Sequence, residues 1–415
     1  MLHKSDDPIV VTGLGAVSPY GLDIEQLWSS IESGANVRSL LDEELSAHVQ
    51  GPVYGNKIEG WDPVPLLGKK GMQFMKPSAQ YLLGSSVLAL KGAGFEEELP
   101  NPDDLAVVVS TNHACTQVRI DYDYTAITDG PKSVSPMDAP NTLTNAPASY
   151  LAIRIQSRAA NTTIANGQCG GLDALGYACN LLRKGRAKYV VVGGVEEINS
   201  RVLWVYDNAN VLSKQSPENA GKSFDESSTG WLPSEGSGAI VLERQSDALA
   251  RGAKILAEIV SWSSSFVADP SPEKRAAGLA RTMNNTLRLG GLTADDVELV
   301  IAGASGVREQ DAAEAIALNS VFASQPDVPV SAVKATIGEC YGASGIFQTI
   351  AAIGAIQRSV IPATPGYETP QEAVPAIAGI RSSARAWNNK QDGTVLISAQ
   401  DIFGASSAVV IRSAV

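Results

Sequence analysis

Short apolar runs bounded by turn-forming residues recur along the chain, and they alternate with segments in which apolar residues return every three or four positions. The first pattern is typical of buried strands, and the second is typical of helices that bury one face. Strands are predicted over residues 8–11, 105–110, 162–165, 189–192, 237–242, 297–302, 328–333, 394–398 and 407–411. Helices are predicted over residues 24–33, 172–182, 311–322 and 344–356.

The strand–turn–helix units fall into two halves with a similar order of elements. A polar stretch at residues 243–252 separates them, and no low-complexity tract interrupts either half. Such repeated units favour two similar α/β layers packed on each other. We therefore divide the chain into an N-terminal half, residues 1–248, and a C-terminal half, residues 249–415.

Glycines follow two of the predicted strands. Gly13 and Gly15 come shortly after the run at residues 8–11, and Gly193 closes the run at residues 189–192. Because glycine is common where a chain turns tightly, the pattern predicts that both strands end at these positions.

Composition narrows the class of protein. The chain has 415 residues, 44% of them hydrophobic, which is enough for a large packed core. A net charge of -12 disfavours nucleic-acid binding, because an acidic surface repels phosphate. No stretch reaches membrane-spanning length, and residues 1–4 open without an apolar signal core. The cysteines are too few and too scattered for a disulfide framework or a zinc site: Cys115, Cys169, Cys179 and Cys340. We expect a soluble, cytoplasmic protein with no metal, nucleic acid or membrane partner.

Several motifs resemble those of the beta-ketoacyl-ACP synthases, the decarboxylative condensing enzymes of fatty-acid and polyketide synthesis. They lie at residues 10–19, 130–136, 141–143, 224–225 and 235–238. With the C-terminal half, the resemblance covers nearly the whole chain in collinear order. It implies a thiolase-type αβαβα five-layer sandwich of two pseudo-repeated halves, which is normally dimeric.

The resemblance also identifies the positions that carry chemistry in that family. There, a Cys at a strand-to-helix turn is the nucleophile, helped by the helix N-terminus and by backbone N–H groups that form an oxyanion hole. Two His stabilise the enolate left when malonyl loses carbon dioxide, and a Lys with a nearby acid supports one of them. The matching positions here hold Gln168 in place of Cys, Gly303 and Glu339 in place of the two His, and Gln348 in place of the acid, while Lys334 is retained.

The histidine count makes this conclusion independent of the fine alignment. The chain has only His3, His48 and His113, so the second half contains none. No shift of register can bring a histidine pair into the site from that half. We therefore do not expect ordinary decarboxylative condensation.

The turn at residues 166–175 resembles that of the chain-length factor, the ketosynthase beta subunit of bacterial type II polyketide synthases, and residues 305–311 do so as well. This resemblance implies a non-catalytic subunit that forms a heterodimer with an active ketosynthase. The interface of the two subunits would form the tunnel that limits polyketide length. It implies no cofactor of the chain's own, because phosphopantetheine is carried by the acyl carrier protein, which we expect to dock mainly on the partner.

A helix at the dimer interface presents tunnel-gating residues in chain-length factors. Counting back from residues 130–133 places those positions at Thr116, Arg119 and Asp123, which share one helical face. They are small or charged rather than bulky, so a salt-bridged gate, a shifted gate and an ordinary solvated helix face remain alternatives.

Other interpretations of the site stay open from the sequence. Cys169 is either a displaced nucleophile or a buried structural residue, and one step along a helix start turns a side chain by about 100°. Gln168 is either a decarboxylase residue or a remnant whose amide must find hydrogen-bond partners, which the turn's own backbone could supply. Lys334 and Glu339 either form a substitute ion pair or face solvent. The alternative functions are therefore a Gln-type malonyl-ACP decarboxylase and an atypical condensing enzyme that uses Cys169.

Overall fold

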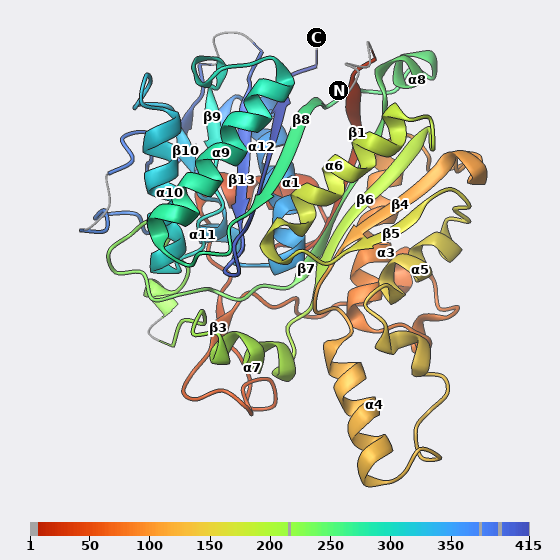
Figure 1. Cartoon of the computed structure of the whole chain (residues 1–415). Coiled ribbons are helices and arrows are strands. Elements are labelled where there is room, and N and C mark those ends of the chain that lie inside the picture. Colours follow the sequence, from red (N-terminus) through yellow and green to blue (C-terminus); the bar gives the residue numbers. More distant parts are fainter. Residues whose placement is uncertain (1–6, 215–216, 373–375, 389–391, 415) are drawn as a thin grey trace.

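The computed structural model describes residues 7–214, 217–372, 376–388 and 392–414, and His3 lies outside them (Figure 1). Ten strands form one mixed sheet in the order β10-β9-β13-β14-β8-β1-β7-β6-β4-β5. The strands are β1 (Ile9–Val17), β2 (Ser39–Leu40), β3 (Tyr54–Gly55), β4 (Leu105–Ser110), β5 (Asn161–Ile164), β6 (Tyr189–Glu196), β7 (Gly236–Arg244), β8 (Ala257–Phe266), β9 (Leu299–Ile301), β10 (Val330–Ser331), β11 (Val360–Ile361), β12 (Arg385–Ala386), β13 (Val395–Gln400) and β14 (Ala405–Arg412).

The helices fill the space around this sheet (Figure 1). They are α1 (Ile24–Ser33), α2 (Val64–Leu67), α3 (Pro77–Gly92), α4 (Thr116–Thr128), α5 (Ala146–Arg154), α6 (Gly170–Arg183), α7 (Ser200–Asn208), α8 (Gln245–Ala250), α9 (Pro272–Gly290), α10 (Arg308–Val321), α11 (Lys334–Ile337) and α12 (Ser344–Arg358).

The two halves of the sheet repeat one topology. The N-terminal half has the order β5-β4-β6-β7-β1, and the C-terminal half has the order β10-β9-β13-β14-β8. In each half the first two pairings are parallel and the next two are antiparallel. The halves meet where β1 pairs with β8. The predicted pair of similar halves is therefore confirmed.

Helices form layers on both sides of the two half-sheets. α3 and α5 pack together against the N-terminal half, and α9 and α10 pack together against the C-terminal half. α6 and α12 pack against each other in the core that both halves share. This arrangement confirms the thiolase-type sandwich expected from the sequence.

The glycines of the first strand do not end it. β1 runs through Gly13 and Gly15 to Val17, so the predicted end at residue 11 is wrong. A Cβ atom at Gly13 would lie 2.1 Å from the Ala89 carbonyl oxygen of α3, and one at Gly15 would lie 2.0 Å from that of Ser85. These glycines let α3 approach the strand, which is a packing role rather than a turn.

The second glycine-closed strand is also longer than predicted. β6 continues through Gly193 and Gly194 to Glu196. A Cβ atom at Gly193 would lie 2.5 Å from Leu82 Cδ1, and one at Gly194 would lie 2.8 Å from Ala343 Cα. Close packing again explains the glycines.

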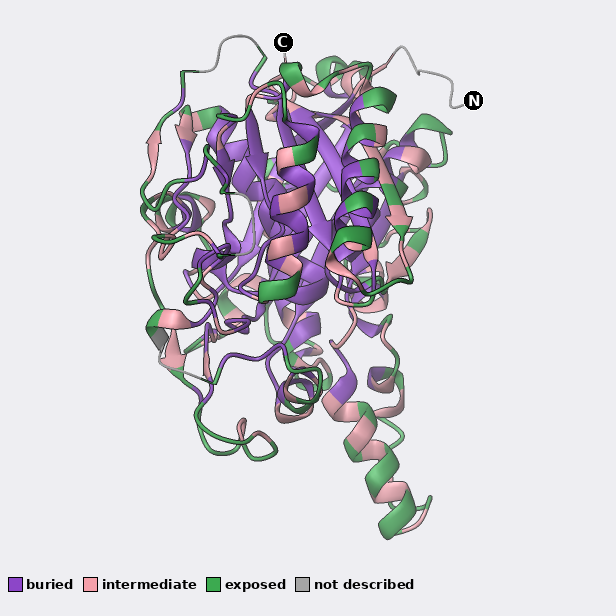
Figure 2. Ribbon diagram, turned by 60° about the vertical axis from the view of Figure 1, so that its left-hand side comes forward, coloured by how far each residue is buried: buried purple, intermediate pink, exposed green. Residues whose placement is uncertain are grey.

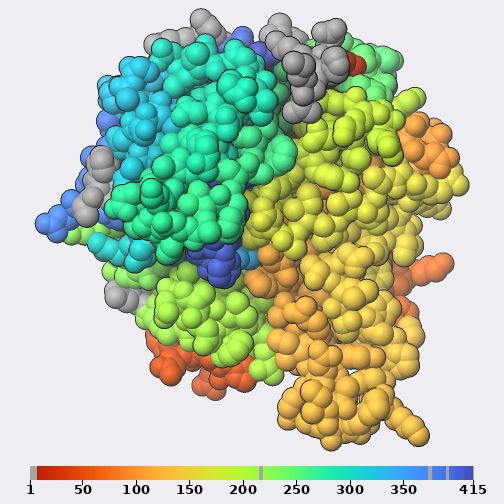
Figure 3. Space-filling model, in the orientation of Figure 1, coloured from red at the N-terminus to blue at the C-terminus, as the bar shows by residue number. Residues whose placement is uncertain are grey.

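α4 projects from the body of the molecule together with the segment that returns to α5 (Figures 1 and 3). Most of α4 is exposed or half-buried, whereas the strands of the sheet are buried (Figure 2). Near the tip, Tyr124 is 65% exposed and Ile127 is 83% exposed.

Two expected absences can be compared with the described residues. Across those residues no helix is both long enough and apolar enough to cross a membrane. In the same part of the chain no group of His, Cys, Asp and Glu side chains is arranged to hold a metal ion. All four cysteines are buried and none forms a disulfide.

Candidate functional site

Gln168 lies in a tight turn, residues Gly167–Cys169, that connects β5 to the first residue of α6. Its side chain is fully buried. Gly167 has a φ of 55°, a left-handed conformation that favours glycine. A Cβ atom at Gly167 would lie 1.9 Å from Asp401 Oδ2, so this turn requires glycine for space as well as for conformation.

The carboxylate of Glu339 is the centre of the site. Gln168 Nε2 donates to Glu339 Oε2 over 2.6 Å, and Lys334 Nζ donates to the same oxygen over 2.9 Å. The other oxygen, Oε1, accepts from the Tyr341 backbone N–H at 2.9 Å and from Ser344 Oγ at 2.6 Å. The side chains of Lys334 and Glu339 have no exposed surface, so their ion pair forms in the interior and not at the surface.

The amide of Gln168 has hydrogen-bond partners at both ends. Beyond its donation to Glu339, its Oε1 accepts from Gln310 Nε2 at 3.0 Å. The partners are side chains from α10 and from the segment after α11, not the backbone of the turn as the sequence suggested. Because the buried amide is satisfied, Gln168 fits as a filling residue.

No side chain fits at Gly303, where the sequence resemblance places the first histidine of the family. A Cβ atom there would lie 2.8 Å from the Ser398 carbonyl oxygen and 3.0 Å from Ala399 Cα. Gln348 Nε2 donates to the carbonyl oxygens of Ala302 and Ser398 at 3.0 and 2.9 Å, which holds β13 against this position. The backbone of β13 therefore lies close to where a histidine side chain would begin.

A buried acid accompanies Gly303. Glu314 Oε1 accepts from the Gly303 backbone N–H at 2.9 Å and from Ser398 Oγ at 2.7 Å. Burial raises the pKa of Glu314, and the nearby Lys334 ammonium partly opposes that rise. Gly303 and Lys334 thus belong to one continuous buried region.

Cys169 is fully buried beside the turn. Its Sγ lies 3.6 Å from the Ala399 carbonyl oxygen. Burial, with added repulsion from Asp173 and Asp401, raises the pKa of the thiol well above its usual value. A reactive cysteine needs the opposite shift, so the structural interpretation of Cys169 is favoured.

Asp401 contacts the turn from the end of β13. Its Oδ2 accepts from the Gln168 backbone N–H at 3.2 Å and from the Tyr341 hydroxyl at 3.2 Å. Its Oδ1 accepts from the Phe403 backbone N–H at 2.9 Å. No sequence motif marks this contact, although the polar pair at the end of a buried strand, Gln400 and Asp401, is a signal that could have identified it.

An aromatic cluster holds Tyr341. Its ring stacks on His113 with centroids 5.1 Å apart, and it also contacts Tyr206 and Trp231. Tyr341 has a φ of 40°, which is unusual for a residue with a side chain. Burial lowers the pKa of His113 to about 4, so this histidine is neutral at neutral pH.

The three predicted gate residues are separate from this buried network. All lie on α4: Thr116 is buried at its first turn, while Arg119 and Asp123 are exposed further along. The structure therefore brings together Gln168, Lys334 and Glu339, whereas the predicted gate positions lie on the projecting helix α4.

Comparison with known proteins identifies the family. The N-terminal domain of beta-ketoacyl synthases matches residues 6–248, and their C-terminal domain matches residues 256–368. A beta-ketoacyl synthase 2 of the actinorhodin polyketide system of Streptomyces coelicolor is 30% identical over 414 residues, which covers 97% of this chain and 98% of the relative. The 3-oxoacyl-[acyl-carrier-protein] synthase 2 of Vibrio cholerae is 28% identical over 377 residues and covers 88% of this chain and 90% of the relative.

Solved structures agree on the fold. A beta-ketoacyl synthase from Burkholderia phymatum superimposes with a TM-score of 0.90 at 22% identity, covering 99% of this chain and 100% of that one. The ishigamide ketosynthase/chain length factor superimposes with a TM-score of 0.87 at 21% identity, again over 99% and 100% of the two chains. Matched along nearly its whole length, this chain belongs to the beta-ketoacyl synthase family.

Proposed function

We propose that this chain is a non-catalytic chain-length factor that pairs with an active ketosynthase in a type II polyketide synthase. The observation that carries the proposal is the closed network at the former catalytic positions. Gln168 and Lys334 both donate to Glu339 in the interior, and the three leave no free nucleophile or general base among them.

The chemistry of the site supports this proposal over catalysis. Decarboxylation of a malonyl group leaves an enolate, which needs positive or hydrogen-donating groups. Glu339 brings a negative charge to one His position, and the space at the other, Gly303, is closed by Ser398. A malonyl carboxylate would be repelled at Glu339 and would meet no side chain at Gly303.

The relatives support a polyketide pathway. The actinorhodin relative is by its name a polyketide synthase component, and one similar structure is described as a ketosynthase/chain length factor. Another is described as a type II ketosynthase bound to its acyl-carrier protein and a hexaketide. We propose that the complex formed by this chain also makes a polyketide.

The free edge of the sheet supports pairing with a second subunit. β5 is the last strand of the sheet. The carbonyl oxygen of Ala160 accepts from Val107 of β4, and that of Ile164 accepts from Thr111 just after β4. The alternate residues Asn161 and Thr163 therefore direct their backbone groups away from β4. An unpaired edge of this kind is a site for pairing with another strand.

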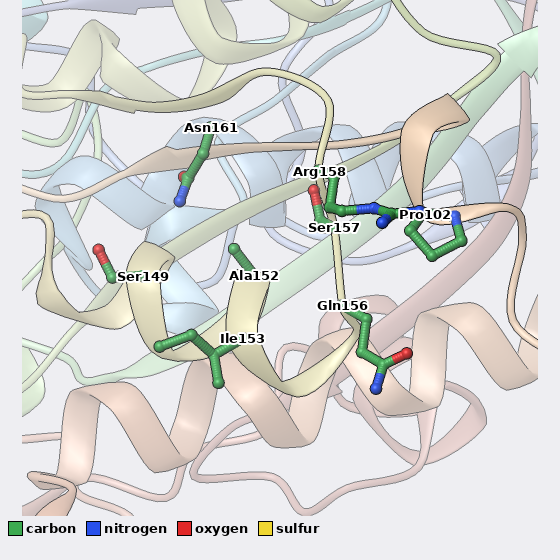
Figure 4. A pocket seen from close by; sticks show the side chains of 8 residues that line it. All are labelled: Pro102, Ser149, Ala152, Ile153, Gln156, Ser157, Arg158 and Asn161. Atoms are coloured by element: carbon green, nitrogen blue, oxygen red, sulfur yellow. The ribbon is translucent and has the colours of Figure 1, made fainter.

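A groove lies beside this edge. It measures about 490 Å³ and is bordered by α5 and by the segment leading into β5 (Figure 4). Ile153 of α5 lines it and is 75% exposed. An apolar side chain of the partner ketosynthase would bury Ile153 there.

α4 projects from the body of the molecule (Figure 1). Apolar side chains near its tip and on the returning segment are exposed: Tyr124, Ile127, Met137 and Leu143. We propose that the partner covers them, and that Thr116, Arg119 and Asp123 then gate the tunnel at the interface.

The chain would hold no cofactor of its own. The carrier protein with its phosphopantetheine would dock mainly on the partner, because this chain's net charge of -12 repels acidic proteins. We propose a cytoplasmic complex.

The competing functions are a malonyl-ACP decarboxylase and a condensing enzyme that uses Cys169. The chain is purified alone and with an active ketosynthase, and carbon dioxide released from malonyl carrier protein is measured for each. We expect none from the chain alone, and tight association with the ketosynthase. Carbon dioxide release without the partner would overturn the proposal in favour of the decarboxylase.

Association can be tested at the strand edge. Thr163→Pro removes an outward N–H and should abolish the heterodimer in size-exclusion chromatography, because proline cannot donate to a new strand. Thr163→Ala keeps that N–H and is the matched control. Equal association of both variants would contradict pairing through β5.

A further inference from the structure

The backbone N–H of Gln168 is already bound by the chain itself. It donates to Asp401 Oδ2 at 3.2 Å, and both residues are buried. In acyl transfer, backbone N–H groups at such a turn bind the carbonyl oxygen of the acyl group, which becomes negatively charged in the transition state. The Asp401 carboxylate, bound to the Gln168 N–H, takes the place that the acyl carbonyl oxygen would occupy.

Asp401 also fills the space in front of the turn. Its Oδ2 is so close to Gly167 that a Cβ atom there would lie 1.9 Å from it. Its position is fixed on two further sides, by the Tyr341 hydroxyl at 3.2 Å and by the Phe403 backbone N–H at 2.9 Å. Tyr341 is in turn held in its aromatic cluster, so the carboxylate is rigidly placed.

We infer that Asp401 excludes acyl groups from the site by occupying the oxyanion-binding N–H of Gln168. Loss of the catalytic residues is then only part of what closes this site. A thioester carbonyl oxygen that approached Gln168 would find its donor taken and would meet a negative charge. This role does not depend on whether the chain sets product length.

The test introduces a nucleophile into the full-length chain. With Gln168→Cys, the new thiol can attack butyryl-N-acetylcysteamine thioester. Its sulfur would form a bond to the acyl carbon, the bond from that carbon to the N-acetylcysteamine sulfur would break, and the thiol proton would pass to the departing sulfur. Butyrylation at position 168 is measured by peptide mass mapping.

We expect Gln168→Cys alone to be acylated slowly. Adding Asp401→Gly or Asp401→Ala should free the N–H and accelerate acylation on the order of 10²-fold, the usual effect of one oxyanion-hole donor. Thermal melting shows whether each variant is folded. If one of the two Asp401 variants is misfolded, the other still provides the test. Alkylation by iodoacetamide, which needs no oxyanion hole, reports that the introduced thiol is reachable in each variant.

Asp401→Asn combined with Gln168→Cys separates occupancy from charge. The Asn side chain fills the same space without a charge that would disfavour a thiolate, so we expect acylation to stay slow. Acylation as fast as in the Asp401→Gly variant would overturn the inference, because charge alone would then explain the effect. Equal acylation with and without Asp401, or no acylation in any variant while iodoacetamide labels them all, would overturn it too.

Discussion

Lys334 Nζ lies 2.9 Å from Glu339 Oε2, and neither side chain has any exposed surface. Removing one partner of such a pair leaves an uncompensated charge in the interior. We predict that Glu339→Gln lowers the free energy of unfolding by about 3–5 kcal/mol, because the Lys334 ammonium loses its carboxylate. Chemical denaturation with urea measures this change.

An exposed ion pair provides the matched control for this substitution. Asp103 and Arg158 lie 3.0 Å apart with both side chains mostly in solvent. Asp103→Asn should change stability little, because surface pairs contribute weakly. A Glu339→Gln protein as stable as the Asp103→Asn protein would count against the buried pair.

Cys169 should be inert in the folded protein. Its thiol is fully buried, and burial raises its pKa well above the usual value, so it stays protonated at neutral pH. We predict no labelling of Cys169 by iodoacetamide or by an acyl thioester at pH 7.5 in the native protein, and full alkylation in urea. Selective native labelling of Cys169 by the thioester would support the condensing-enzyme alternative.

The gate can be tested in a heterodimer with an active ketosynthase. Thr116→Trp adds a large side chain at the first turn of α4, which is the proposed tunnel wall. We expect shorter polyketides, measured by mass spectrometry of the products. Ser29→Trp, at an exposed position of α1, should leave the product length unchanged. An unchanged profile in both variants would contradict the assignment of the gate.

The buried carboxyl of Glu196 should make stability depend on pH. It lies at the end of β6 and accepts from the backbone N–H groups of Asn112 and His113 at 2.7 and 3.0 Å. Burial raises its pKa from 4.5 to about 8. Between these values the folded protein holds a proton that the unfolded chain lacks, so raising the pH favours unfolding.

The useful window for this measurement is pH 6.5 to 8. The pKa of His113 is lowered from 6.5 to about 4, so its opposite contribution is confined to lower pH. We predict that the free energy of unfolding falls across the window, and that Glu196 contributes at most about 1.4 kcal/mol per pH unit to this fall. Burial raises the pKa values of Glu197 and Asp311 to about 7, so these carboxyls add to the slope in the same direction. Glu196→Gln should make the slope shallower. Stability that rises with pH across this window would contradict the prediction.

Much of the secondary structure could be predicted where burial is one-sided or complete. The predicted helix at residues 24–33 and strand at residues 105–110 coincide with α1 and β4. The long α9 and its neighbour β8 were missed because polar residues face each other between them. Ser263 and Thr286 share a hydrogen bond of 2.8 Å in this interface. Because such buried residues are polar, their sequence is similar to that of an exposed loop.

The candidate site could be predicted in part for a similar reason. Motif spacing located Gln168, Lys334 and Glu339, since each lies in a segment that resembles the family. Asp401 and Gln310 could not be found in that way, because only the tertiary fold brings β13 and α10 to the turn. Long-range hydrogen bonds leave no periodic pattern in the sequence.

The close approach of β13 to Gly303 makes substitution at this position hard to reverse. Returning a histidine to this position would place its Cβ atom 2.8 Å from the Ser398 carbonyl oxygen, so the strand would have to move first. Replacing Glu339 first would leave Lys334 without its counter-ion. Each of these two changes, made alone, therefore passes through a less stable protein. The packing of the core around Gly303 and the buried ion pair of Lys334 thus resist reversal at both positions.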